Sequence, residues 1–273
     1  MTRVGIIGGA GRMGHAIAGC LLEGREPGLQ LACSIDLAGN PAQGQDLGVL
    51  SGRAPCGVKL SASLPEALEK ADLFIDFSFH TGIKERLNLL RQAGKSAVVG
   101  TTGLTPAEIQ ALEEAAQEMP LLFAPNMSLG VNLLASLVEK AARTLKDKGY
   151  DIEITEMHHR MKKDAPSGTA IFLGEAAARG SDWVLPEVQK DGRSGIEGER
   201  PAKEIGFHAL RGGDVVGDHT VRFAADGELI DLSHRATRRE TFAIGALRAA
   251  AWLSDRPAGR LYSMNDVLGL DGI

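Results

Sequence analysis

The chain is poor in cysteine, in long apolar runs and in excess positive charge, and each shortage excludes a class of protein. The three cysteines, Cys20, Cys33 and Cys56, have neither an even count nor metal-ligand spacing, so we expect reduced thiols and no disulfide framework. No segment approaches the roughly 18 consecutive apolar residues of a membrane span. The first residues carry too short an apolar run for a secretion signal. We therefore expect a soluble, cytoplasmic protein that does not bind membranes.

Basic residues do not outnumber acidic ones, which excludes the positive footprint of a nucleic-acid binder. Lys and Arg total 30 against 35 Asp and Glu, for a formal net charge of -5. The 273 residues suggest two domains or one large one. Glycine, in contrast, is abundant, with 34 residues against an average usage of about 7%. Since no repeat accounts for them, we expect these glycines to serve individual backbone positions.

The first half of the chain alternates apolar strands with helical segments. The expected strands are Arg3–Ile7, Leu29–Ile35, Asp72–Phe77, Ser96–Gly100 and Leu121–Ala124. Each is a continuous apolar run, which is typical of a parallel sheet covered on both faces. A long glycine-punctuated loop, Leu37–Gly57, interrupts the series and suggests a functional or mobile segment. We predict an α/β fold whose first domain is a Rossmann-type doubly wound parallel sheet.

The pattern changes after about residue 126. A long helical segment leads into Tyr150–His159, and three later strand-like segments follow one another with no helix between them. Such strands indicate an open, mixed sheet in a second α+β domain. We predict a dinucleotide-binding domain at 1–127, a substrate-binding and oligomerisation domain at 128–238, and a C-terminal segment, 239–273, that returns to the first domain.

The glycine-rich turn Gly9-Ala10-Gly11-Arg12-Met13-Gly14 directly follows the first strand and opens the first helix. That context matches a dinucleotide-binding turn, whose backbone N–H groups and helix N-terminus bind a pyrophosphate. Asp36 ends the second strand, near the place expected for a carboxylate that binds ribose hydroxyls. Leu37 follows, where an arginine would suit NADP, so we expect NADH to be used at least as well as NADPH. A glycine turn beside an unrelated aspartate is the competing interpretation.

Two further loops follow strands of the same predicted sheet. They are Gly100-Thr101-Thr102-Gly103 and Ala124-Pro125-Asn126-Met127. Loops at the carboxyl ends of doubly wound strands line the cofactor crevice, so both suit the nicotinamide end of a cofactor. On spacing alone, ordinary turns explain them equally well.

The segment Glu156–Ala170 concentrates the chemistry of the second half. His158 and His159 are adjacent at a strand end and point to opposite sides, and Lys162 lies four residues after His158. Pro166-Ser167-Gly168-Thr169 opens a helix whose free N–H groups suit an anion. Together these residues indicate a site for an acidic small molecule, with His158 and Lys162 as proton donors or acceptors. A solvated basic loop before an ordinary capped helix is the alternative, and the adjacent histidines disfavour a metal site.

These motifs carry a resemblance that runs from end to end of the chain. Gly8–Gly14, Gly100–Gly103, Glu156–Ala170 and Asp214–His219 are similar to segments of the 4-hydroxy-tetrahydrodipicolinate reductase (dihydrodipicolinate reductase) family. The resemblance implies reduction of a cyclic, unsaturated dicarboxylate to tetrahydrodipicolinate with NADH or NADPH, in the diaminopimelate route to lysine. It also implies a homotetramer built through the sheets of the second domain, which is an insertion in the chain.

The resemblance assigns roles residue by residue. His158 matches the catalytic histidine and Lys162 the proton-donating lysine, although the residues alone leave open which of them supplies the proton. Substrate-binding positions match His159, Gly168 and Thr169. Cofactor contacts match Gly8, Gly9, Ala10, Gly11, Arg12, Met13, Asp36, Gly100, Thr101, Thr102, Ala124, Pro125, Asn126 and Met127.

Some positions depart from the family pattern. Met127 stands where many members have phenylalanine, Leu37 where some have a basic residue, and Ser78 and His80 where threonine and arginine are common. These departures bear on the choice between NADH and NADPH. Two other functions are a dehydrogenase for a different amino acid and an inactive dinucleotide sensor. The intact Glu156–Ala170 segment argues against both.

Overall fold

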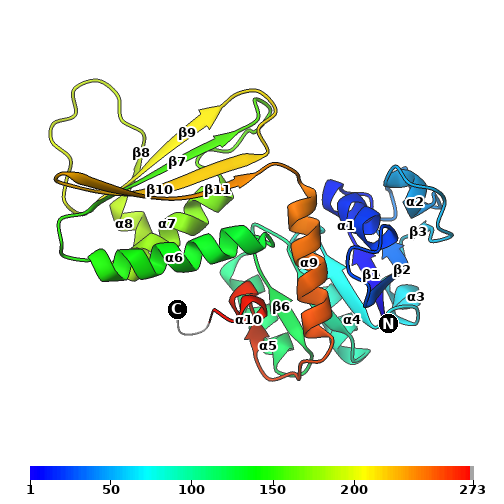
Figure 1. Ribbon diagram of the computed structural model, residues 1–273. Helices are drawn as coiled ribbons and strands as arrows, with labels where there is room; N and C mark the ends of the chain where they lie inside the picture. Colours follow the sequence, from blue (N-terminus) through cyan, green and yellow to red (C-terminus); the bar gives the residue numbers. More distant parts are fainter. Residues whose placement is uncertain (271–273) are drawn as a thin grey trace. The chain divides into compact units, whose positions relative to one another are not determined.

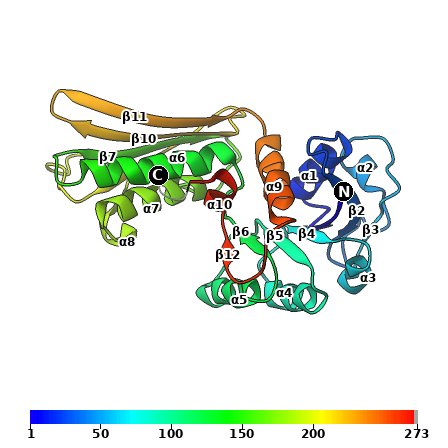
Figure 2. The same ribbon diagram turned by 60° about the horizontal axis from the view of Figure 1, so that its bottom comes forward.

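The computed structural model describes residues 1–270 and divides the chain into two compact units. The first contains Met1–Leu129 and Glu240–Gly269, and the second contains Gly130–Arg239 and Leu270. Figures 1 and 2 show the elements of each unit. None of the described helices is long and apolar enough to cross a membrane.

The first unit is built on a parallel sheet of seven strands in the order β12-β6-β5-β4-β1-β2-β3. Its strands are β1 (Thr2–Ile7), β2 (Leu29–Ile35), β3 (Leu60–Ser61), β4 (Leu73–Asp76), β5 (Ser96–Val99), β6 (Leu121–Phe123) and β12 (Leu261–Tyr262). From β1 the chain adds β2 and β3 on one side and β4, β5 and β6 on the other. The order therefore reverses between β1 and β4, where doubly wound folds bind ligands beyond the carboxyl ends of the strands.

Helices cover both faces of this sheet (Figures 1 and 2). One layer comprises α1 (Arg12–Leu22), α2 (Leu47–Leu50), α9 (Glu240–Leu253) and α10 (Met264–Leu268). The other layer comprises α3 (Leu64–Leu68), α4 (Ile83–Gln92) and α5 (Pro106–Ala116). Strand β4 is buried at every position because a core lies on each side of it. The predicted doubly wound α/β fold is confirmed.

The second unit is built on a mixed sheet of five strands in the order β11-β10-β7-β9-β8. Its strands are β7 (Asp151–His158), β8 (Gln189–Asp191), β9 (Ile205–Arg211), β10 (Gly217–Ala225) and β11 (Glu228–Ala236). Strands β7, β9 and β8 run parallel, whereas β10 runs antiparallel to both β7 and β11. The predicted open mixed sheet is therefore confirmed.

The helices of the second unit are α6 (Leu129–Leu145), α7 (Gly168–Ser181) and α8 (Leu185–Val188), and Figure 2 shows α6 and α7 along one face of the sheet. Their apolar side chains form one core with alternate residues of the strands. Along β7, Ile152, Ile154, Glu156 and His158 are buried, and the residues between them are more exposed. The period-two pattern thus carries a glutamate and a histidine onto the face that packs against the helices.

Sequence periodicity missed the shortest elements, which are α2, β3, β8, α8, β12 and α10. Elements of two to five residues are too short to show a helical or alternating period. Two of them lie in or just after the long loop Leu37–Gly57, in which the Asp46 side chain makes several hydrogen bonds. The Asp46 carboxylate accepts hydrogen bonds from the backbone N–H groups of Gly48, Cys56 and Gly57, which ties the middle of the loop to its C-terminal end.

Candidate functional site

The glycine turn after β1 packs so tightly that side chains are excluded. A Cβ on Gly9 would lie 1.8 Å from Ser34 Oγ, and one on Gly14 would lie 2.4 Å from the carbonyl oxygen of Gly8. Gly8 itself has a φ of +85°, which L side chains rarely adopt. Because these residues are glycines, the backbone of the turn can approach the strands and a ligand more closely than it could if they had a Cβ.

The start of α1 leaves its backbone donors available. Gly11 is the N-cap, and within residues 1–270 no side chain caps this end of the helix. The N–H groups of the first turn and the positive end of the helix dipole therefore suit a pyrophosphate. Arg12 and Met13 are the first two residues of the helix. Arg12 is exposed and Met13 is half-buried. These features fit a nicotinamide dinucleotide.

Asp36 lies beside the glycine turn, directly beyond β2. Its Oδ2 accepts a hydrogen bond of 2.9 Å from the backbone N–H of Ala10, and its Oδ1 accepts one of 2.8 Å from Leu37 N. The carboxylate is thus fixed at the edge where a ribose would meet the turn. The Leu37 side chain, which follows it, is 71% exposed.

The loops after β5 and β6 leave the same edge of the sheet as the glycine turn. A Cβ on Gly100 would lie 2.3 Å from the ring of Phe77, and Thr101 is buried next to the end of β4, whereas Thr102 is exposed. In the other loop Ala124 and Met127 are buried in the core, while Pro125 is exposed and Asn126 accepts a hydrogen bond from Ser128 N. The side chains of Ala124 and Met127 are therefore packed in the core rather than exposed in the loop.

In the second unit, His158 ends β7 in a nearly buried position. Its Nδ1 lies 2.6 Å from Glu156 Oε2, and its ring meets the ring of His219 edge to face, with 5.0 Å between centroids. Burial lowers the pKa of His158, and the neighbouring Lys162 adds to the lowering, while Glu156 opposes it. The imidazole is therefore neutral near pH 7 and able to exchange one proton.

His159 and Lys162 follow in the loop between β7 and α7. His159 Nε2 lies 3.4 Å from a guanidinium nitrogen of Arg239, and the Lys162 ammonium lies 2.9 Å from Asp164 Oδ1. The Asp164 side chain is 61% exposed, so its pairing with Lys162 is weak and can be exchanged for another carboxylate.

Helix α7 presents its N-terminus beside this loop. Ser167 is the N-cap and accepts a hydrogen bond from Ala170 N, while the next two residues, Gly168 and Thr169, form the first turn. A Cβ on Gly168 would meet no atom within 4 Å, so open space adjoins the helix end. A neutral histidine, a lysine and a helix N-terminus thus follow one another within a short segment of the second unit. These are the groups that a site for an acidic molecule needs.

Comparison with known proteins matches both units. A family model described as dihydrodipicolinate reductase, N-terminus, matches residues 2–127, and one described as dihydrodipicolinate reductase, C-terminus, matches residues 130–268. The chain belongs to the dihydrodipicolinate reductase family.

Individual relatives of this family cover the chain almost completely. A 4-hydroxy-tetrahydrodipicolinate reductase of Anaeromyxobacter dehalogenans is 48% identical, with 100% of this chain and 99% of the relative covered. One of Hahella chejuensis is 45% identical over 99% and 100%. The solved structure of dipicolinate-bound dihydrodipicolinate reductase from Paenisporosarcina sp. TG-14 is 26% identical, with a TM-score of 0.73 and coverage of 96% and 97%. The reductase family thus accounts for both domains.

Sequence reasoning missed three residues around the histidine of this reductase-family chain. Glu156 and Arg211 form an ion pair beside His158, and the ring of His219 contacts the ring of His158. The alternation of Ile152 and Ile154, continued to residues 156 and 158, could have placed Glu156 and His158 on one buried face. Arg211 and His219 come from β9 and β10, and no local pattern brings those strands beside β7.

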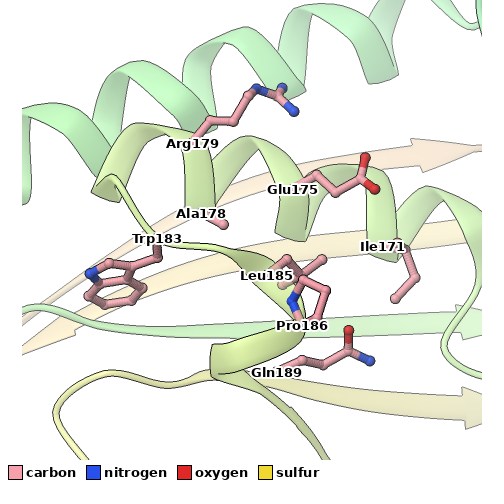
Figure 3. A pocket seen from close by; sticks show the side chains of 8 residues that line it. All are labelled: Ile171, Glu175, Ala178, Arg179, Trp183, Leu185, Pro186 and Gln189. Carbon is pink, nitrogen blue, oxygen red and sulfur yellow. The ribbon is translucent and has the colours of Figure 1, made fainter.

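The second unit contains a surface pocket. It is lined by side chains of α7, of α8 and of the turn between them, among them Glu175, Arg179, Trp183 and Pro186 (Figure 3). The predicted site residues His158, Lys162, Gly168 and Thr169 do not line it. The pocket is therefore separate from the candidate site of the reductase.

Proposed function

We propose that the chain reduces 4-hydroxy-tetrahydrodipicolinate to tetrahydrodipicolinate with NADH or NADPH, in the diaminopimelate route to lysine. The observation that carries the proposal is the arrangement of His158, Lys162 and the N-terminus of α7 in a chain of this reductase family. A dicarboxylic substrate needs cationic and N–H donors, and this segment supplies both.

The first unit would hold the cofactor. The N–H groups at the start of α1 would bind the pyrophosphate, and Asp36 would accept hydrogen bonds from ribose hydroxyls. Gly8, Gly9, Ala10, Gly11, Arg12 and Met13 would surround the phosphates, and Gly100, Thr101, Thr102, Ala124, Pro125, Asn126 and Met127 would contact the nicotinamide end. When bound, the reduced nicotinamide supplies a hydride.

The second unit would bind and protonate the substrate. Lys162 and the N–H groups of Gly168 and Thr169 would bind its carboxylates, with His159 at the rim. The 4-hydroxyl leaves as water, which gives the unsaturated ring; hydride addition to that ring leaves negative charge on the substrate, and a proton must neutralise it. The positive charge of Lys162 contributes to the lowered pKa of His158, so the two side chains lie near each other, and one of them would supply this proton.

We also propose a cytoplasmic homotetramer assembled through the sheet of the second unit. Helices α6 and α7 lie on one face of that sheet (Figure 2). Exposed apolar side chains occur on its strands, including Leu210 at 51% and Leu229 at 62% exposure. A second copy of the chain would remove this surface from water, and sedimentation would report the assembly directly.

One assay tests the catalytic proposal. Oxidation of NADH and NADPH is followed by absorbance with and without the cyclic dicarboxylate, which is generated enzymatically. Substrate-dependent oxidation supports the proposal. Intact binding of NADH without turnover would instead favour a dinucleotide sensor, and turnover only with a different amino-acid substrate would favour another dehydrogenase.

A further inference from the structure

Glu156 is a buried carboxylate in which every acceptor position is engaged. The residue is 1% exposed. Its Oε2 accepts from His158 Nδ1 at 2.6 Å and from Arg211 Nη1 at 2.8 Å. Its Oε1 accepts from Arg211 Nη2 at 2.8 Å and from the backbone N–H of Ser167 at 3.1 Å. One carboxylate thus joins the end of β7, the end of β9 and the N-cap of α7.

Arg211 extends the same connection to the lysine. While both of its terminal nitrogens pair with Glu156, Nη2 also donates to the backbone carbonyl of Asp164 at 2.6 Å. The side chain of Asp164 in turn holds Lys162. One bidentate ion pair, between Arg211 and Glu156, therefore helps to orient both the histidine and the lysine. A planar guanidinium is the group suited to two parallel hydrogen bonds with a carboxylate.

The contact with Glu156 determines which nitrogen of His158 carries the proton. Burial raises the pKa of Glu156, but the hydrogen bonds from Arg211 and His158 outweigh it and the pKa is lowered overall. An ionised carboxylate can only accept, so the neutral imidazole must carry its proton on Nδ1. Nε2 is then the nitrogen that exchanges a proton with a bound molecule.

His219 closes the remaining side of the imidazole. It lies opposite Glu156 in the pairing of β10 with β7, and its Nε2 is 3.1 Å from Ser167 Oγ. Burial lowers its pKa to about 4, so it is neutral near pH 7 and does not compete with His158 for the carboxylate. The charged and titratable groups around His158 are thus Glu156 of β7, Lys162 of the following loop, Arg211 of β9 and His219 of β10.

We propose that Glu156, held by Arg211, is a positioning residue that fixes His158 with its proton on Nδ1 and its Nε2 toward the substrate. The inference rests on the proposed reductase function for its kinetic consequence, but the tautomer itself is a property of the protein alone. Because a buried ion pair is not in general a source of net stability, the orientation of the histidine explains this pair better than stability does.

The chain offers a matched control on the same strand. Glu153 also makes several ion pairs, with Arg193, Arg200 and His208, and lies on the opposite face of β7. Burial raises its pKa, but these partners together lower it to about 2. Glu153→Gln therefore removes a comparable carboxylate from the same strand without touching His158.

The first measurement is of the tautomer. Long-range ¹⁵N–¹H correlation spectra of the wild-type protein report which nitrogen of each histidine is protonated, and His158→Gln assigns the signal by its disappearance. We expect His158 to be protonated at Nδ1 in the wild type and in Glu153→Gln, and to lose that preference in Glu156→Gln. A wild-type His158 protonated at Nε2 overturns the proposal even if every variant fails to fold.

The second measurement is kinetic. We expect Glu156→Gln to lower kcat by about 100-fold or more with KM changed by less than about threefold, and to shift the pH profile of kcat. Arg211→Lys keeps a cation but not the paired geometry, so its kcat should fall by less. An unchanged kcat and pH profile in a folded Glu156→Gln protein contradicts the inference. Absence of substrate-dependent turnover in the wild type contradicts the proposed function instead and leaves the tautomer result standing.

Discussion

The two units prepare for their ligands in opposite ways. In the first, the turn after β1 needs residues without side chains, because Gly9 packs closely against Ser34 and Gly14 against the backbone of the turn. In the second, the end of β7 carries buried polar and charged side chains that form hydrogen bonds and an ion pair with one another. The comparison indicates that the first site should respond to added volume and the second to a change of charge or proton position.

Removing the histidine should produce the largest effect. His158→Gln keeps a polar side chain but cannot exchange a proton, so we expect kcat to fall by about 10²- to 10⁴-fold with little change in KM. Steady-state kinetics at saturating cofactor would measure it. An unchanged kcat would remove His158 from proton transfer and make the second site a binding site only.

Added volume in the glycine turn should be the next largest. A Cβ on Gly14 would lie 2.4 Å from a backbone oxygen, so Gly14→Ala must move the turn and should cost about 1–3 kcal/mol in unfolding free energy. We also expect weaker NADH binding, measured by fluorescence titration. The control is Gly19→Ala in the same helix, where the nearest atom is 3.4 Å away on the flexible side chain of Arg53. If both variants bind NADH equally well, the close packing at Gly14 is not required for NADH binding.

Acid should destabilise the second site through His219. The pKa of this histidine is lowered from 6.5 to about 4 by burial, so the unfolded chain takes up a proton more readily than the folded one. Its neutral form contributes fully above about pH 6.5, and that contribution falls as the pH drops toward 4, by about 3 kcal/mol. Denaturant unfolding at several pH values should show this slope. His219→Gln should flatten it in this window, and an unchanged slope in a folded His219→Gln protein would show that this histidine does not cause it.

The smallest effect concerns cofactor choice. Asp36 repels a 2′-phosphate and Leu37 cannot bind one, so we expect kcat/KM for NADH to equal or exceed that for NADPH. Leu37→Arg should raise kcat/KM for NADPH by about tenfold, since an exposed arginine adds one charged contact. Leu37→Gln is the uncharged control. A strong NADPH preference in the wild type would show that residues other than Asp36 and Leu37 bind the 2′-phosphate.

The same contrast explains what the sequence could predict. The glycine turn, its strand and Asp36 are close in the chain and follow a spacing that backbone geometry imposes, so both the fold of the first unit and its ligand edge could be read locally. The histidine and lysine were visible as a cluster. Their support was not, because Arg211 and His219 reach His158 only through the pairing of β9 and β10 with β7. Register between distant strands leaves no signal within either one.

The position of α9 has a consequence for how the chain is made. Ala243, Ala246, Leu247 and Leu253 of this helix are fully buried in the core of the first unit, yet they follow the whole second unit in sequence. A growing chain therefore leaves the apolar face of α1 and the parallel sheet without its covering helix until Glu240–Leu253 has emerged from the ribosome. During that interval the second unit, whose core residues all lie between positions 134 and 232, can complete its core first. Protection of nascent chains from aggregation should thus matter most for the first unit.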